Sequence, residues 1–433
     1  MYKRDIVTFL FVVSFAVYGI GNYVSAAMSP SLGYVMSASP YLAIIVFYVL
    51  DVMYGGRVRV RVDNLYPYML VYIISGVWSL FYSLHRGLPD ITLFTVIGRS
   101  LLVALPFHAF LVVYAYNERR QDDFMPKMIF YSLTLLLFVN ILGYGAGLSN
   151  QGHNIEGRVN LPFFGGLYSA ASVLVVMSLM LIWRMRKVWW SNPFRMAGYS
   201  GFLAVNFLFL YLINSRLTLM IFAAMLVLIF IGGIRSIAVY WVSFFMIPLL
   251  LNLSILVYQI LTLPVFASIM QRVDYENVTS FSGRSYLWEI GMAWIVGDRT
   301  GFVFGNGFQG QYFVGILREI AMLWNPDTPD KMHFHSSSLE ILFNQGLFGF
   351  IPFAIVLFKL YKRYREKFVK NKPSGILFFG LVYLMFDLQV SSFIYLDALG
   401  GLILAVMAAG VAVKAPVMAP QPEPELVEMN ALA

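Results

Sequence analysis

Histidines and arginines are the residues of this sequence best suited to chemistry. His335 lies in the segment Met-His-Phe-His-Ser-Ser-Ser-Leu-Glu at 332–340, directly before a long apolar run. An imidazole has an ordinary pKa near 6.5, so at neutral pH it can accept a proton as a general base. Four arginines stand at or near the same predicted side of the chain: Arg99, Arg158, Arg216 and Arg284.

Arginine carries a permanent charge and a fixed fork of donors that matches the oxygens of phosphate. Several arginines that converge at a membrane surface would suit a diphosphate headgroup. The structural alternative for each is a side chain that snorkels to water or pairs with a carboxylate. The motifs around Arg216 and Arg284 favour a functional role, and Arg158 and Arg99 are further candidates for substrate binding.

The histidine segment allows three interpretations. His335 acts as a general base, or it is a satisfied interfacial histidine, or it pairs with His333 on a metal together with a carboxylate such as Asp330. The third is the weakest, because the chain has five histidines and no cysteine, and we predict no metal and no cofactor. Ser336 suits a helix N-cap and Glu340 the first turn, and with His333 they are candidate substrate-binding residues.

Other polar motifs are less specific. The glycines of 305–310 resemble a nucleotide loop only faintly and lack the strand–helix setting; they favour a turn that lets the backbone approach a ligand or a helix entrance. Asp387 and Gln389 are polar groups in an apolar run, where a functional pathway and helix-to-helix hydrogen bonding are equally plausible. An Asp-X-Asp pair at the head of an outer loop is missing from the sequence, which argues against glycosyltransferases that hold a diphosphate through a divalent cation.

The elements that position these residues must be membrane helices. Of 433 residues, 60% are hydrophobic and 12% are charged, and the mean hydropathy is +0.74. Soluble domains are about 45–50% apolar and about 25% charged, so a soluble globular protein is excluded. The lack of cysteine excludes disulfides, zinc–thiolate sites, iron–sulfur clusters and cysteine nucleophiles.

Apolar runs of about 20 residues predict an all-α integral membrane protein with about twelve spans. The first run is followed closely by a second and has no small-residue cleavage site, so we predict a span and not a removable signal peptide. The predicted spans are 6–27, 32–54, 66–84, 91–116, 126–148, 163–183, 197–214, 217–234, 237–262, 337–358, 374–393 and 397–413.

The charge distribution predicts the orientation. With both termini in the cytoplasm, about 21 of the 30 basic residues lie on the inside, as the positive-inside rule requires. The net charge of +8 is therefore explained by the orientation of the chain in the membrane. We predict a lipid bilayer and no nucleic acid as partner. The basic run at 359–372 predicts a cytoplasmic anchor near anionic lipid, and 414–433 predicts a disordered cytoplasmic tail.

The one long connection, 263–336, is predicted to be a large periplasmic loop. A loop of this length in a compact protein is usually functional or disordered, and the helical spacing at 284–295 and 313–323 favours two ordered surface helices. The resulting division is 1–200 as N-terminal transmembrane helices, 201–413 as a core that contains the loop, and 414–433 as the tail.

Four motifs, in order, resemble the O-antigen ligase/polymerase superfamily. They are Asn-Ser-Arg-Leu at 214–217, Ser-Gly-Arg-Ser-Tyr-Leu-Trp at 282–288, Phe-Gly-Asn-Gly-Phe at 304–308, and His-Ser-Ser-Ser-Leu-Glu at 335–340 followed by Gly346 and Gly349. The resemblance covers about 200–358.

This resemblance implies a glycosyltransferase of the GT-C type in the bacterial inner membrane, metal-independent, with its active site in the periplasm. Such enzymes move a glycan from undecaprenyl diphosphate to an acceptor hydroxyl. Carried over, Arg216 and Arg284 would hold the diphosphate and His335 would act near the acceptor. Many ligases have Asn two places after the histidine, and Ser337 stands there in this sequence.

The resemblance leaves several functions open. A polymerase would join repeat units of O-antigen, capsule or exopolysaccharide, with an acceptor glycan and a chain-length regulator as partners. A ligase would transfer the finished chain to lipid A–core. A transporter of polyprenyl-linked glycans and a purely structural membrane protein are the alternatives from other classes, although transporters usually show internal symmetry, which this sequence lacks.

Overall fold

The computed structural model describes residues 3–89, 91–118, 121–149, 158–188, 191–213, 215–248, 284–318, 322, 332–391 and 398–413. Within these residues the chain is helical, and its only extended pairing is a single bridge between Val62 and Val413. The predicted tail at 414–433 and the first part of the long loop, 263–283, lie outside the described residues.

The first half of the chain contributes long helices. They are α1 (Lys3–Ala27), α2 (Pro30–Met53), α3 (Tyr66–His85), α4 (Leu93–Tyr116), α5 (Gln121–Gly145), α6 (Leu167–Val188), α7 (Pro193–Ile213) and α8 (Arg216–Phe230).

The second half mixes short and long helices. They are η2 (Gly233–Arg235), α9 (Ala238–Phe244), α13 (Arg284–Gly297), α14 (Arg299–Phe304), α15 (Gly310–Val314), α17 (Ser337–Val369), η5 (Pro373–Ile376), α18 (Leu377–Asp387) and α19 (Leu399–Ala412).

Eight of the described helices are long and apolar enough to cross a membrane, which fits a multi-pass membrane protein. They correspond to predicted spans one to seven and ten. Three shorter apolar helices, α8, α18 and α19, correspond to spans eight, eleven and twelve. Of the ninth predicted span only the beginning, with α9, falls among the described residues, so the number twelve stays a prediction.

The helix of the tenth span is longer than predicted. It was expected at 337–358, but α17 continues to Val369. The apolar run ends where lysines and arginines begin, yet one face of the helix stays buried beyond that point, at Leu360, Tyr361, Tyr364 and Phe368. Helical periodicity therefore continues after the hydrophobic run has ended.

The outer segment agrees with the prediction in its first helix and differs in its second. α13 covers the predicted 284–295. A helix at 313–323 is also predicted; α15 ends at Val314, where Gly315 adopts a left-handed conformation with φ 72°. Arg318 and Met322 are again helical, and 319–321 and 323 lie outside the described residues. A glycine in this conformation is a common helix terminator, and the apolar spacing did not reveal it.

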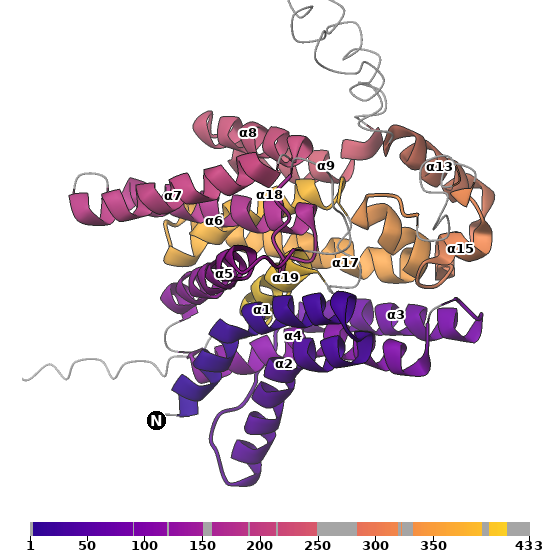
Figure 1. Cartoon of the computed structure of the whole chain (residues 1–433), viewed down its shortest axis with the longest axis horizontal. Helices are drawn as coiled ribbons and strands as arrows, with labels where there is room; N and C mark the ends of the chain where they lie inside the picture. The colour runs from indigo at the N-terminus through magenta and orange to yellow at the C-terminus, as the bar shows by residue number, and fades with distance from the viewer. Residues whose placement is uncertain are drawn as a thin grey trace, which may run out of the picture.

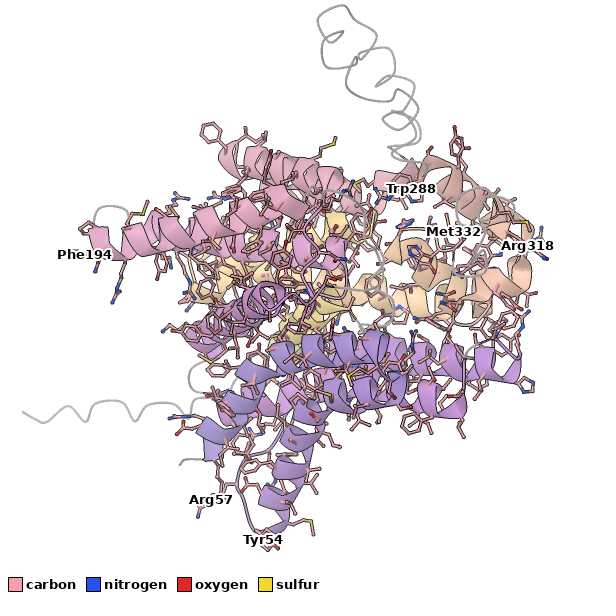
Figure 2. The ribbon with its side chains drawn as sticks, in the orientation of Figure 1. Tyr54, Arg57, Phe194, Trp288, Arg318 and Met332 are labelled. Carbon is pink, nitrogen blue, oxygen red and sulfur yellow. The ribbon has the colours of Figure 1, made fainter. Side chains whose placement is uncertain are left out.

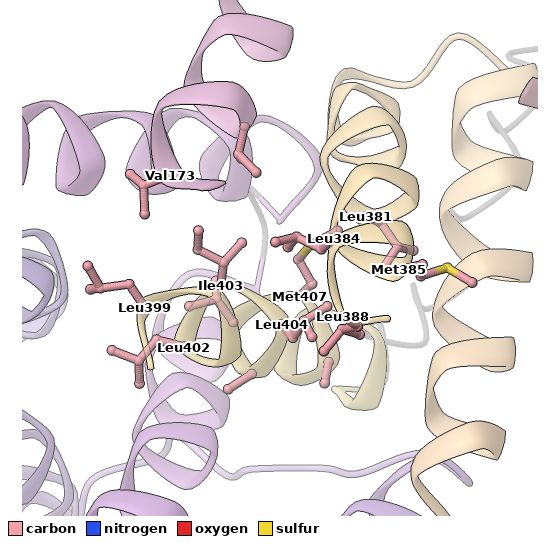
Figure 3. Close-up of a cluster of buried hydrophobic side chains, with 14 of the residues drawn as sticks. Val173, Leu381, Leu384, Met385, Leu388, Leu399, Leu402, Ile403, Leu404 and Met407 are labelled. Atoms are coloured by element: carbon pink, nitrogen blue, oxygen red, sulfur yellow. The ribbon is translucent and has the colours of Figure 1, made fainter. Parts of the chain in front are cut away.

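Most of the long helices lie roughly along the horizontal direction of Figure 1, with α13 and α15 at the right end and the N-terminus at the lower left, whereas the end of α2 points downward. The helices α6, α18 and α19 meet in the interior. Their apolar side chains interlock there, with Val173 facing a cluster that includes Leu384, Ile403 and Met407 (Figure 3).

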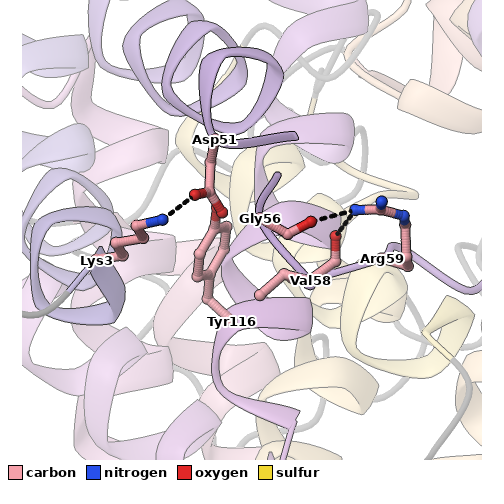
Figure 4. Close-up of polar contacts among 6 residues, drawn as sticks. All are labelled: Lys3, Asp51, Gly56, Val58, Arg59 and Tyr116. Atoms are coloured by element: carbon pink, nitrogen blue, oxygen red, sulfur yellow. Dashed lines mark hydrogen bonds and ion pairs between the residues drawn. The ribbon is translucent and has the colours of Figure 1, made fainter. Parts of the chain in front are cut away.

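A polar contact ties three helices together near the N-terminus. Asp51 of α2 pairs with Lys3 of α1 and accepts a hydrogen bond from the Tyr116 hydroxyl of α4 at 2.5 Å (Figure 4). In the loop after α2, Arg59 donates to the carbonyls of Gly56 and Val58. A buried carboxylate of this kind requires such partners.

Candidate functional site

Tyr168 brings together two of the predicted site residues. It stands at the start of α6, and the Arg284 guanidinium carbon lies 5.2 Å from the centre of its ring. The ring of His335 packs edge-on against the same tyrosine, with 6.3 Å between centroids. Arg284, from the start of α13, and His335, just before α17, are thus neighbours across one aromatic ring.

Arg284 is buried and has an acidic neighbour. Its charge acts on the carboxylate of Asp387 at the end of α18. That carboxylate accepts hydrogen bonds from the hydroxyls of Ser172 in α6 and Ser391. Because a buried charge needs a partner of opposite charge or hydrogen bonds, this group of hydroxyls and carboxylate explains how the fold tolerates a buried guanidinium.

His335 is held in a backbone conformation that side-chain-bearing residues rarely adopt. Its φ is 51°, in the left-handed region. Such residues cost about 1–3 kcal/mol and persist only where the surroundings determine them, often at functional sites. His335 N–H donates to Nδ1 of His333 at 3.2 Å, and the two rings lie 4.1 Å apart.

The residue before His335 is fixed from two sides. The Phe334 N–H donates to a Glu340 carboxylate oxygen at 2.6 Å, and the Phe334 carbonyl accepts from the Trp288 indole at 3.1 Å. Gly291 leaves room for the Phe334 ring to approach α13. The outer helix and the first turn of α17 together therefore impose the conformation of the histidine segment.

The start of α17 is also locked to the segment after α18. Ser336 caps the helix by accepting from the Leu339 N–H, and the Ser337 N–H donates to the carbonyls of Leu388 and Ser391. The Gln389 amide donates to the Ser338 hydroxyl at 2.8 Å. For Gln389, the structure thus displays the helix-to-helix hydrogen bonding that was one of the two interpretations.

Glu340 is fully buried, and both its carboxylate oxygens accept hydrogen bonds from the protein. Phe334 donates to one oxygen and the Asn344 amide to the other. Ser336 is buried as well. Both residues were candidates for substrate binding, and we infer from these contacts that they position the histidine segment.

α17 is broken at Gly346, and the glycine turn 305–307 fills the break. Gly346 has φ 64° and ψ −166°, which is non-helical. The Asn306 and Gly307 N–H groups donate to the carbonyls of Phe343 and Asn344, which the broken helix leaves without their usual partners. The glycine turn therefore packs against a break inside α17, nine residues after the helix begins, and the approach to a ligand stays a prediction.

A serine face of α3 supports the same break. Ser75 donates to the Gln345 side chain, and Ser79 donates to the Asn344 carbonyl. Ser83 donates to the Phe308 carbonyl. Small hydroxyl side chains at every fourth position let membrane helices pack closely and hydrogen-bond to each other.

Asp298 organises the short outer helices. It caps α14 through the Gly301 N–H at 2.9 Å and accepts from the Trp294 indole at 3.1 Å. The Gly301 N–H is the main reason that the pKa of Asp298 is lowered from its ordinary value. The ionised carboxylate therefore stabilises this outer segment at neutral pH.

Arg158 and Arg216 belong to neighbouring segments at the same end of the bundle. The Val159 N–H donates to the Leu212 carbonyl near the end of α7. Arg216 is the first residue of α8, whose capping Ser215 donates to the Thr218 hydroxyl, and α8 packs against α6 and α18. The chain around Arg158 thus touches the corner that leads to Arg216.

Arg99 occupies a different place. Its Nε donates to the Tyr34 hydroxyl at 3.1 Å, and its guanidinium lies 4.7 Å from the centre of the Phe308 ring. It lines a pocket of about 250 Å³ with Asn22, Ser25 and Gly165 among others. Arg99 therefore contacts Phe308 beside the glycine turn, and its pocket includes Gly165, three residues before Tyr168.

Sequence motifs did not point to Tyr168, Ser172 or the serines of α3. Tyr168 follows Gly165-Gly166 at the entrance of a predicted span, and the serines recur at intervals of four in another. These patterns are visible in the sequence, but each is common in membrane helices, and only their tertiary partners distinguish them.

The described residues offer few ligands for the alternative in which His333 and His335 bind a metal. Nδ1 of His333 accepts a backbone hydrogen bond, and Asp330 lies outside the described residues. Among the residues that are described, no group of three or more His, Cys, Asp or Glu side chains could hold a metal ion.

The fold and site define a helical multi-pass membrane protein with a polar site at one end, and Trp288 and Met332 mark this end in Figure 2. Residues 200–354 match the model of a family described as O-antigen ligase. This confirms the resemblance to the O-antigen ligase/polymerase superfamily, and it indicates ligase- or polymerase-type glycosyl transfer in O-antigen biosynthesis. No curated protein matches the chain.

Proposed function

We propose that this protein is an inner-membrane glycosyltransferase that moves a glycan from undecaprenyl diphosphate to an acceptor hydroxyl at the periplasmic face. The observation that carries the proposal is the meeting of Arg284 and His335 across Tyr168, within a site formed in part by the segment that matches the family model. A phosphate-binding cation and a general base are the two groups this reaction requires.

The proposed reaction is a single displacement. The acceptor oxygen attacks the anomeric carbon, the bond from that carbon to the diphosphate oxygen breaks with its electron pair, and the acceptor proton passes to His335. Arg284 and Arg216 stabilise the charge that develops on the diphosphate. Arg158 is a further candidate, because its neighbour Val159 hydrogen-bonds to Leu212, four residues before Arg216. Direct displacement inverts the configuration at the anomeric carbon and needs neither a metal nor a covalent enzyme intermediate.

Helix geometry supports an anionic ligand at this place. α6, α8, α13 and α17 all begin at this end of the bundle. The N-terminal end of a helix carries a partial positive charge and favours anions. Together with the arginines, these helix starts would attract a diphosphate more strongly than either feature alone.

The pocket beside Arg99 is our candidate for part of the glycan. It offers the hydroxyl of Tyr34, the amide of Asn22 and the ring of Tyr23. Hydroxyl, amide and aromatic groups are what a sugar ring contacts through its own hydroxyls and its apolar face.

We favour a polymerase that joins repeat units of O-antigen, capsule or exopolysaccharide, with a chain-length regulator as partner. The alternative is an O-antigen ligase that transfers the chain to lipid A–core. The description of the family as O-antigen ligase favours the ligase. Ser337 stands where many ligases have asparagine, and the resemblance covers only the core that both activities share, which supports the polymerase. A glycan transporter is the alternative from another class.

Surface-glycan profiles of a deletion strain complemented with single variants test the proposal. We expect His335→Ala, Arg284→Ala and Arg216→Ala to lose at least 99% of product at wild-type expression, because base catalysis alone contributes about 100- to 10,000-fold. Arg299→Ala and His85→Ala are the matched controls, since both side chains are exposed on the outer elements, and they should behave as wild type.

The nature of the defect separates the two activities. A glycan ladder that collapses to one repeat unit on lipid A–core identifies a polymerase. Long chains that accumulate on the lipid carrier beside bare core identify a ligase. Normal profiles for all three site variants would refute glycosyl transfer at this site and favour the transporter.

A further inference from the structure

A second polar pocket lies at the opposite end of the bundle from His335. Its volume is about 350 Å³, and it is lined by Trp183, Arg186, Lys187, Arg235, Phe368, Val369 and Asn371. Tyr168 and Trp183 both belong to α6, so the site and this pocket are about 22 Å apart along that helix, at 1.5 Å per residue. The charge distribution predicts this end to be cytoplasmic.

Three cations from two distant parts of the chain line this pocket. Arg186 and Lys187 come from the last turn of α6, and Arg235 ends η2. None of the described residues that line the pocket is acidic, and the nearby Glu366 pairs with Arg363 instead. Like charges around one hollow repel each other, and a bound anion would offset this repulsion.

An aromatic cluster forms the wall behind the cations. The rings of Trp183 and Phe368 lie 5.5 Å apart, and the Arg235 guanidinium lies 5.4 Å from the centre of the Phe368 ring. Val369 at the rim is exposed. Tryptophan and other aromatic rings with an apolar rim are typical of the headgroup level of a bilayer.

The C-terminal end of α17 and the residue Asn371 that follows it line the pocket. Asn371 adopts a left-handed conformation with φ 54°, and the Lys372 N–H donates to the Lys367 carbonyl at 2.9 Å. This arrangement ends the helix. Arg365 donates to the Arg235 carbonyl and so ties η2 to α17 beside the pocket. The cations are therefore carried by elements that are fastened to each other.

We propose that this pocket binds the phosphate headgroup of an anionic membrane lipid. Basic pockets between transmembrane helices on the cytoplasmic side are suited to such headgroups. The proposal differs from a diffuse attraction of the basic run 359–372 to the membrane, because it requires the particular cations from α6 and η2. It is also independent of glycosyl transfer at the other end.

The test measures lipid binding to the full-length protein in detergent micelles by native mass spectrometry, with phosphatidylglycerol against phosphatidylcholine. We expect phosphatidylglycerol to bind selectively, and the triple variant Arg186→Gln, Lys187→Gln, Arg235→Gln to bind it at least tenfold more weakly. The control variant Arg57→Gln, Arg59→Gln, Arg61→Gln removes the same charge from the loop after α2 and should stay within twofold of wild type.

A charge-preserving variant and a competition with inorganic phosphate complete the test. The charge-preserving variant Arg186→Lys, Arg235→Lys should retain most of the binding, which a misfolded pocket would not. Equal losses in the pocket and control variants, or no loss in the pocket variant, would overturn the proposal. Displacement of the lipid by millimolar inorganic phosphate would also overturn it and assign the pocket to a soluble phosphate.

Discussion

At the scale of single residues, the site depends on one histidine in an unusual conformation. The φ of 51° at His335 is imposed by the bonds that Glu340 and Trp288 make to Phe334. Neither of these two side chains needs to touch substrate to matter. A left-handed conformation costs stability for a residue with a Cβ, and at His335 it sets the direction of the ring.

This strain predicts a separation of stability from activity. The free energy of unfolding of His335→Gly should exceed that of His335→Ala by about 1 kcal/mol, because glycine adopts the left-handed conformation without the cost that a Cβ brings. His335→Gly should therefore unfold at a higher temperature. Both variants should lack glycosyl transfer. Thermal unfolding in detergent checks the difference, and equal stability of the two variants would show that the conformation is not strained.

The ring of Tyr168 predicts a second effect. Tyr168→Ala should lower glycan transfer by about 10- to 30-fold, because a cation–π contact is worth up to about 2 kcal/mol in a desolvated setting. Tyr168→Phe keeps the ring and should retain most of the activity. If the phenylalanine variant fails as severely as the alanine variant, the hydroxyl and not the ring is the important group.

At the scale of elements, the break at Gly346 separates the first turns of α17 from the rest of the helix. Gly346 and Gly305 face each other at the crossing of α17 with α14, where added Cβ atoms would lie 2.4 Å from the Val303 carbonyl oxygen and 2.3 Å from the Asn344 carbonyl oxygen. The first two turns of α17 carry Glu340 and Asn344, so their direction sets the place of the histidine segment.

Gly346→Ala should therefore destabilise the protein by about 3 kcal/mol, since its backbone conformation is essentially restricted to glycine. The matched control is Gly201→Ala in α7, where an added Cβ meets nothing within 4 Å and helix propensity should add up to about 1 kcal/mol of stability. Unfolding midpoints of the two variants measure the contrast. A Gly346→Ala protein as stable as wild type would mean that the break is not required.

At the scale of the whole molecule, the site and the basic pocket lie at opposite ends of the bundle. Figure 1 shows α13 and α15 at one end and the N-terminus toward the other. The positive-inside rule predicts that the end with α13 faces the periplasm.

The absence of native cysteine makes this orientation directly measurable. Val296 in α13 is 81% exposed and Tyr54 after α2 is 86% exposed. In spheroplasts, a membrane-impermeant maleimide should modify Val296→Cys at once and Tyr54→Cys only after the membrane is permeabilised. The reverse pattern would invert the topology and place the proposed active site in the cytoplasm.

The sequence by itself determined the membrane class, most helix positions and the residues worth testing, because apolar runs and charge asymmetry are local properties that lipid enforces strongly. It located His335 and Arg284 through motifs, and it anticipated the start of α17 at Ser337. It did not reveal the interruption of the predicted second outer helix, where Gly315 in the left-handed conformation ends α15.

Only the tertiary structure decided which of these residues meet. Residues 168, 284, 335 and 387 are far apart in the chain, and helix packing brings them together. The same packing places Arg99 against Tyr34 of α2 and the ring of Phe308. The kink at Gly346 and its support by Ser75 and Ser79 depend on contacts between distant segments, which local sequence patterns do not encode.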